Sequence, residues 1–259
     1  MTPLEQVRAD VLECMWEAPQ YLFFSPEVDP LIYYSHLFPA VAALILAVIV
    51  IASRHKSLSS VLFVIISLLF VVFAVLDLLL WAIIDSSWIM FYWSAIIYVE
   101  LLIYTVTLYL ILVFSYGEDI STKAKAALGV LLLPLLIFGP TNLNLSGFDY
   151  SNCWRLAVEG PLSYYLYAVE IVIVGWILST LFLIRRKVKD EERIRMSRYL
   201  IVGSLLFLLA LSSGNIFGTI FQGELGENSW IIAQYGLFGM PLFLGFVMYI
   251  IVRFHAVVS

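Results

Sequence analysis

Long runs of apolar residues, separated by short polar segments, fill most of this chain. Seven such runs occupy residues 31–53, 58–84, 89–116, 124–139, 162–184, 199–221 and 230–252. A bilayer core about 30 Å thick is crossed by about 20 helical residues, and every run except the fourth reaches that length. The fourth run is short and contains Pro134. Because backbone polar groups in lipid must be satisfied within the protein, we expect these runs to be helices.

The predicted fold is therefore an all-α integral membrane protein with a seven-helix transmembrane bundle over residues 31–253. The composition supports a membrane protein, with 63% hydrophobic and only 13% charged residues and a mean hydropathy of +0.99. Membrane-spanning strands would give alternating segments of about ten residues, and the sequence has none.

The positions of Lys and Arg predict the orientation of the bundle. With the N-terminus outside, all 14 basic residues except Arg8 and Arg155 fall on the inner side. The positive-inside rule then places the C-terminus, with a short tail at residues 254–259, in the cytoplasm of a multi-pass cell-membrane protein. The net charge of −5 gives no reason to expect a nucleic-acid partner. We expect no removable signal peptide, because no basic leader precedes a short apolar core with a cleavage site.

The first 30 residues form a separate outer segment. Thr2, Pro3 and Glu5 stand where an N-cap, a first-turn proline and a capping-box glutamate begin a helix. Apolar residues then recur at helical spacing as far as Trp16, which predicts an amphipathic helix over residues 3–18. An aromatic interfacial patch follows at residues 21–24. The segment either anchors the chain to the outer surface or covers the outer mouth of the bundle.

The two cysteines, Cys14 and Cys153, both fall in predicted outer segments. Because the outer face is usually oxidising, one hypothesis is a disulfide that ties the N-terminal segment to the loop after the fourth helix. The other hypothesis is two unpaired thiols, since sequence does not give the separation of their Cα atoms. The three histidines lie far apart in the sequence and no Cys/His cluster occurs, so we predict no metal site.

The largest inner loop, residues 185–198, mixes charged residues of both signs with strong helix formers. We predict that it continues the fifth and sixth helices into the cytoplasm. Two roles are open for it. It sets the topology and touches anionic lipid, or it is a docking surface for a cytoplasmic partner.

Ionisable residues inside a bilayer are costly and often mark functional sites. Three acids fall within the predicted spans, and other polar and aromatic residues lie at similar depths in the outer half. On the third helix, Trp93, Glu100 and Tyr104 recur at intervals that bring them to one face. We predict an outward-opening ligand pocket formed by Asp77, Trp81, Trp93, Glu100, Tyr104, Glu170, Ser212, Asn215 and Gln234.

No Lys or Arg lies within the spans to neutralise Asp77, Glu100 and Glu170. Since burial disfavours the charged form of a carboxyl group, one interpretation is that these acids are protonated and hydrogen-bonded between helices. A second is a site for a cationic or polar ligand. A third, a proton or ion path, is disfavoured because the polar residues do not continue to the inner face. We predict that Glu100, the deepest acid, faces the bundle interior.

Glycines and a proline mark the last two helices. Gly214 and Gly218 form a small-xxx-small pattern that permits close helix approach. Pro241 removes a backbone hydrogen bond within the seventh helix and should kink it.

Sequence motifs of catalysis are missing: the chain has no GxSxG, no HExxH and no phosphate-binding loop. The seventh helix has no Lys for a retinal Schiff base. We therefore expect neither catalytic activity nor a cofactor. A matched pair of broken helices, typical of transporters built from inverted repeats, is also missing.

Several segments resemble the N-terminal seven-transmembrane sensor region of bacterial histidine kinases. They are the basic stretch 193–198 leading into residues 199–203, the seventh-helix segment 234–241 with its end at 249–254, and the loop at 147–153. The resemblance covers most of the chain and implies a sensor of an external or membrane cue that signals to a fused cytoplasmic domain. This chain departs from the family because it has no phospho-acceptor helix and no ATP-binding domain, and His255 lacks the context of an acceptor.

We therefore predict a membrane sensor or receptor module of a two-component-like signalling system. The alternatives are a small-solute transporter or channel and a non-catalytic membrane scaffold. The expected partners are the lipid bilayer, a cytoplasmic signalling protein or a fused kinase domain that this chain lacks, and a second copy of the chain in a homodimer.

Overall fold

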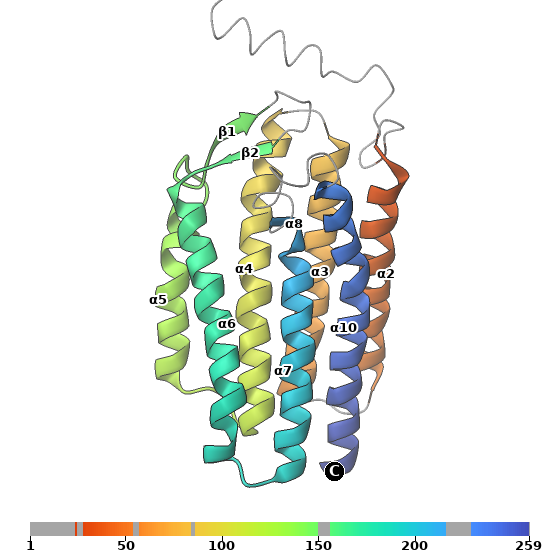
Figure 1. Cartoon of the computed structure of the whole chain (residues 1–259), viewed down its shortest axis with the longest axis vertical. Helices are drawn as coiled ribbons and strands as arrows, with labels where there is room; N and C mark the ends of the chain where they lie inside the picture. Colours follow the sequence, from red (N-terminus) through yellow and green to blue (C-terminus); the bar gives the residue numbers. More distant parts are fainter. Residues whose placement is uncertain are drawn as a thin grey trace, which may run out of the picture.

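The computed structural model describes residues 24, 28–53, 57–83, 86–149, 156–215 and 229–258. These residues form a bundle of antiparallel helices with a small β-hairpin at one end (Figure 1). The helices are α2 (Pro30–Ala52), α3 (Leu58–Ala82), α4 (Ser86–Tyr116), α5 (Thr122–Phe138), α6 (Pro161–Lys187), α7 (Glu191–Leu211), the short α8 (Ser213–Asn215) and α10 (Ser229–Val258). The hairpin pairs β1 (Leu145–Asp149) with β2 (Leu156–Glu159).

Six of these helices contain stretches long and apolar enough to cross a membrane: α2, α3, α4, α6, α7 and α10. The prediction of an all-α, multi-pass membrane protein is confirmed at this level. The remaining long helix, α5, has 17 residues and contains Pro134, and it is shorter than the roughly 20 residues that a bilayer core requires. It corresponds to the fourth and shortest apolar run of the sequence.

Side chains at the helix starts explain where the helices begin. Asp29 directly precedes Pro30, the first residue of α2. Its carboxylate accepts a hydrogen bond from the Leu31 N–H at 2.7 Å. Ser57 and Ser121 accept in the same way from backbone N–H groups one turn later. Asp190 accepts from two N–H groups at the start of α7. Each cap satisfies donors that the first turn of a helix leaves without partners.

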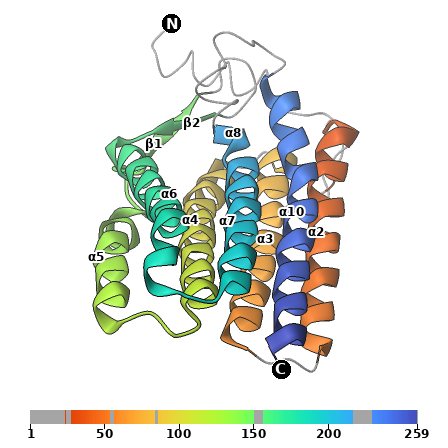
Figure 2. The same cartoon turned by 60° about the horizontal axis from the view of Figure 1, so that its bottom comes forward.

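The helices pack in an order that leaves α4 and α7 most enclosed. α4 contacts α3, α6 and α7, while α10 lies between α7 and α2. α5 lies at the edge of the bundle against α6, as Figures 1 and 2 show. Large apolar side chains are exposed along the outside of several helices, for example Ile45, Phe182 and Leu242. Exposed apolar side chains on several neighbouring helices suit contact with lipid.

The two ends of the bundle differ in chemistry. We call the end with β1 and β2 the hairpin end, and the opposite end, with the α6–α7 connection, the basic end. The basic end carries Lys123 and Lys125 in the first turn of α5, Arg253 near the end of α10, and the basic residues of 185–198. Helices α6 and α7 continue into that segment as predicted, leaving only residues 188–190 between them.

Three sequence predictions need correction. The sixth helix was expected to run from 199 to 221, but α7 ends at Leu211 and Ser212 forms a turn before α8. The segment between α5 and α6, expected as a loop, contains the β1–β2 hairpin. The seventh helix continues to Val258, beyond its predicted end at 252 and into the predicted tail. The predicted amphipathic helix at 3–18, Cys14 and Cys153 lie outside the described residues.

Candidate functional site

Glu100 lies near the middle of α4, inside the bundle. Its side chain is only 5% exposed, and Tyr104 and Thr107 on the same face of α4 are buried as well. Trp93, earlier on the helix, is partly buried against the main apolar core. The prediction that Glu100 faces the bundle interior is confirmed by this burial. A lipid-facing glutamate would have lacked these polar neighbours.

Glu170 is a second buried acid, about two and a half turns into α6. Its side chain is 7% exposed, and it lies near enough to Glu100 for the two carboxyl groups to interact electrostatically. The Oε1 atom of Glu170 is buried without a hydrogen-bond partner among the described residues. A buried acceptor without a partner costs about 1–3 kcal/mol, and a proton or a bound ligand at this oxygen would remove that cost.

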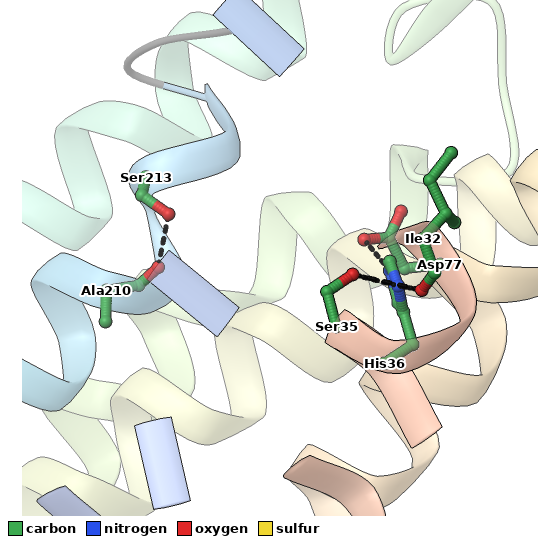
Figure 3. A network of polar contacts seen from close by, with 6 residues as sticks. All are labelled: Ile32, Ser35, His36, Asp77, Ala210 and Ser213. Carbon is green, nitrogen blue, oxygen red and sulfur yellow. Dashed lines mark hydrogen bonds and ion pairs between the residues drawn. The ribbon is translucent and has the colours of Figure 1, made fainter. Parts of the chain in front are cut away.

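The end of α7 lies against the same region. Ser212 donates its hydroxyl hydrogen to the Leu208 carbonyl at 3.1 Å, so the hydrogen bond between Tyr104 and Ser212 has the Tyr104 O–H as donor. Ser213 donates to the Ala210 carbonyl at 2.6 Å (Figure 3). The Leu208 and Ala210 carbonyl groups also accept from the Ser212 backbone N–H, so these serine hydroxyls are second donors to groups that already have a partner.

The two buried acids give this region its negative character. α7 stops below the hairpin-end limits of α3 and α4 (Figure 1), but its Leu208 and Ala210 carbonyl groups already accept hydrogen bonds from Ser212 and Ser213. We call Glu100, Tyr104, Glu170 and Ser212 the acidic site. Such a site can bind a cation or hold protons.

Asp77 belongs to a different site. The structure pairs it with His36 of α2, whose Nε2 lies 2.9 Å from the Asp77 Oδ2. His36 is 1% exposed and Asp77 is 23% exposed. Trp81 packs beside this pair, against the small apolar cluster of Val28, Ile32 and Leu78. The expectation that Asp77 has no basic partner was therefore wrong.

The hydrogen bonds of His36 define how its protons are placed. Nδ1 lies 2.6 Å from the Ile32 carbonyl, which can only accept, so Nδ1 is the donor (Figure 3). The contact between Nε2 and Asp77 then contains one proton, on either atom, and the pair is neutral as a unit. Ser35 also lies 3.1 Å from Nδ1, but its hydroxyl donates to the Ile32 carbonyl. Because Nδ1 already bears a proton, His36 cannot act as a base toward Ser35.

The structure thus separates the residues of the single pocket expected from the sequence into two groups. Asp77 and Trp81 lie at the α2–α3 contact, and Glu100, Tyr104, Glu170 and Ser212 form the acidic site between α4, α6 and α7. Asn215 falls on α8 and Gln234 on α10, but the side chains of both lie outside what the structure describes.

Two polar residues escaped the sequence analysis. His36 lies within the first apolar run, and an intramembrane histidine is a recognised signal of a functional site. Tyr167 on α6, one turn before Glu170, donates to Glu159 of β2 at 2.6 Å. Nothing in the sequence marked Tyr167, because tyrosines are frequent throughout this chain.

No family model, curated protein or solved structure matches the chain. The resemblance to the sensor region of bacterial histidine kinases stays a prediction from the sequence segments that carry it.

Proposed function

We propose that this chain is the membrane sensor module of a two-component-like signalling system, and that its cue is a small cation bound at the acidic site. In this proposal the chain lies in the cell membrane and crosses it seven times, with α5 as the fourth span. Its N-terminus is outside. The module acts without catalysis of its own. It passes its signal to a cytoplasmic partner or fused domain, as the sensor-region resemblance implies, and it works alone or as a homodimer.

The unpartnered Oε1 of Glu170 beside Glu100 is the observation that carries this proposal. An ionised side chain at the bilayer centre costs about 2.5–3.5 kcal/mol on insertion scales, and two neighbouring acids also repel each other. A cation that bridges them would offset both costs and would satisfy the open oxygen. Protonation of the acids is the competing explanation.

Helix α7 connects the acidic site to the basic end. Its last turn hydrogen-bonds Tyr104 through Ser212, and its first turn lies at the opposite side of the bundle. A helix is a stiff element, so a change at Ser212 on ligand binding can move the α6–α7 connection where a signalling partner would dock.

The test measures the thermal unfolding midpoint of the purified protein in nanodiscs. We compare NaCl, KCl and methylammonium chloride with N-methylglucamine chloride at equal ionic strength. At least one of the three small cations should raise the midpoint by several degrees, because a ligand that binds only the folded state stabilises it. Glu100→Gln and Glu170→Gln should each remove that increase.

Asp77→Asn is the matched control, because it removes an intramembrane carboxylate outside the acidic site. It should leave the cation effect in place. If none of the three cations raises the midpoint, or if the increase survives in both glutamine variants, the acidic site is not a cation site and protonated acids explain its burial.

A cation transporter is the second candidate, because α7 ends inside the bundle. Interrupted membrane helices whose C-terminal ends coordinate cations occur in secondary transporters. Flux separates the two functions: liposomes containing the protein should take up the stabilising cation no faster than protein-free liposomes if the chain is a sensor. Uptake that depends on Glu170 would favour the transporter.

A further inference from the structure

The connection between α6 and α7 at the basic end carries a groove of about 450 Å³. Arg185 at the end of α6 lines it together with Arg195 and Arg198 of α7. Glu191, Glu192 and Tyr199 also contribute to its walls. The groove is remote in the fold from the acidic site and from the His36–Asp77 pair, which lie toward the hairpin end.

The groove lies where the apolar surface of the bundle ends. Tyr199 is 50% exposed, and Val202 and Leu206, which follow it on α7 toward the hairpin end, are exposed apolar residues. Phe182 and Leu183 give α6 the same character just before Arg185. Tyrosine is enriched at the membrane–water boundary. The groove therefore opens at the level of lipid headgroups, with acyl-chain contacts available beside it.

The arginines of the groove are only weakly engaged within the protein. Arg185 lies 4.0 Å from Glu191, and Arg195 lies 3.8 Å from Glu192. Both pairs are long and solvent-exposed, and such pairs contribute little. Arg198 has no ion pair within the part of the chain that the structure describes. All three guanidinium groups can therefore turn toward a ligand.

The charge of the surroundings favours an anion. Residues 185–198 contain seven basic and three acidic residues. Guanidinium groups bind phosphate oxygens through two parallel hydrogen bonds, which a single ammonium group cannot do. Basic pockets between membrane helices at the headgroup level are a recurrent mode of anionic lipid recognition.

We propose that this groove binds the phosphate of an anionic phospholipid from the leaflet at the basic end, with Arg195 and Arg198 as the principal ligands and Arg185 completing the site. Its place at the edge of the apolar surface favours a lipid over a soluble phosphate compound. The inference does not depend on the cation proposal.

Native mass spectrometry of the delipidated protein tests this site with defined lipids. Palmitoyl-oleoyl phosphatidylglycerol and the zwitterionic palmitoyl-oleoyl phosphatidylcholine are added in equal amounts. The wild-type protein should retain the anionic lipid at least fivefold over the zwitterionic one. Arg195→Gln/Arg198→Gln should reduce that preference below twofold.

The matched control is Arg186→Gln/Lys189→Gln, which removes the same charge from the same connection but outside the groove. It should keep the preference. The preference of Arg195→Lys/Arg198→Lys for the anionic lipid should lie between those of the wild-type protein and the double glutamine variant. Lysine retains the charge but cannot donate two parallel hydrogen bonds to a phosphate. Equal unfolding midpoints of all variants in detergent show that each is folded.

Three results would overturn the proposal. The first is equal retention of the two lipids by the wild-type protein. The second is an equal loss in the control variant, which would show a general charge effect. The third is displacement of the anionic lipid by millimolar glycerol 3-phosphate, which would show a site for soluble phosphate.

Discussion

His36 and Asp77 show how two residues with costly side chains become tolerable inside the bundle. Because the Ile32 carbonyl fixes the proton on Nδ1, the pair carries no net charge whichever of Nε2 and Oδ2 has the shared proton. A neutral pair avoids most of the cost of burying a single charge, whereas removal of one partner leaves the other without compensation.

A double-mutant cycle tests this pairing. We expect His36→Leu and Asp77→Leu each to lower the free energy of unfolding by about 1–3 kcal/mol, because each leaves the other side chain of the pair without its hydrogen-bond partner. The double variant should lose at least about 1 kcal/mol less than the sum of the two single losses. The measurement is unfolding in mixed micelles of increasing denaturing detergent.

The control cycle combines His36→Leu with Glu170→Leu, whose side chain lies in the acidic site. Those two effects should add, since the residues share no partner. Additive losses in the His36–Asp77 cycle would show that the 2.9 Å contact contributes no coupling.

At the scale of elements, the contact between α7 and α10 depends on glycine. A Cβ at Gly236 would lie 3.0 Å from the Ala210 carbonyl oxygen and 2.8 Å from the Ser213 Cβ, with the Ser213 hydroxyl nearer still. A Cβ at Gly214, by contrast, would meet open space. Gly214 was expected to permit close approach, but Gly236 does so. Gly218 lies outside the described residues.

Gly236→Ala should therefore destabilise the bundle by about 1–3 kcal/mol, because overpacking must move α10 away from α7. Gly245→Ala on the same helix is the matched control, since a Cβ there meets nothing within 4 Å. Alanine is the better helix former by up to about 1 kcal/mol, so the control should be neutral or stabilised. Thermal unfolding midpoints distinguish the two, and equal shifts would contradict the close packing at Gly236.

At the scale of the molecule, successive long helices run in opposite directions (Figure 2). The described basic residues therefore fall near helix ends at one end of the bundle. Contact of this end with the cytoplasm is the expectation from the positive-inside rule. The acidic site would then lie nearer the outer face and the arginine groove in the inner leaflet, so both proposals share one orientation.

Cysteine labelling tests that orientation. Single cysteines at Ser146 in β1 and at Lys189 between α6 and α7, with Cys14 and Cys153 replaced by alanine, report on opposite ends of the bundle. A membrane-impermeant maleimide applied to intact cells should label Ser146→Cys and should reach Lys189→Cys only after the membrane is opened. Labelling in the reverse pattern would invert the topology.

The sequence alone determined the class of protein, the approximate helix limits and the burial of Glu100. These follow from local requirements: lipid forces every backbone group to bond within its own helix, and helical spacing places Glu100 and Tyr104 on one face. The first two apolar runs, which begin at residues 31 and 58, start within one residue of α2 and α3. The caps Asp29 and Ser57, which act within one turn, fix these starts in the structure.

Only the tertiary structure decided which polar groups meet. His36 and Asp77 are 41 residues apart in the chain, and nothing in either helix specifies that these faces turn toward each other. The end of α7 at Leu211 escaped prediction because the apolar pattern continues past it, and the serine contacts at its end, Ser212 to Leu208 and Ser213 to Ala210, are local bonds that helices also make in their interiors. Residues close in sequence decide where a helix forms. Which polar residues share a site depends on which helix faces pack together, and that packing involves the whole surface of each helix.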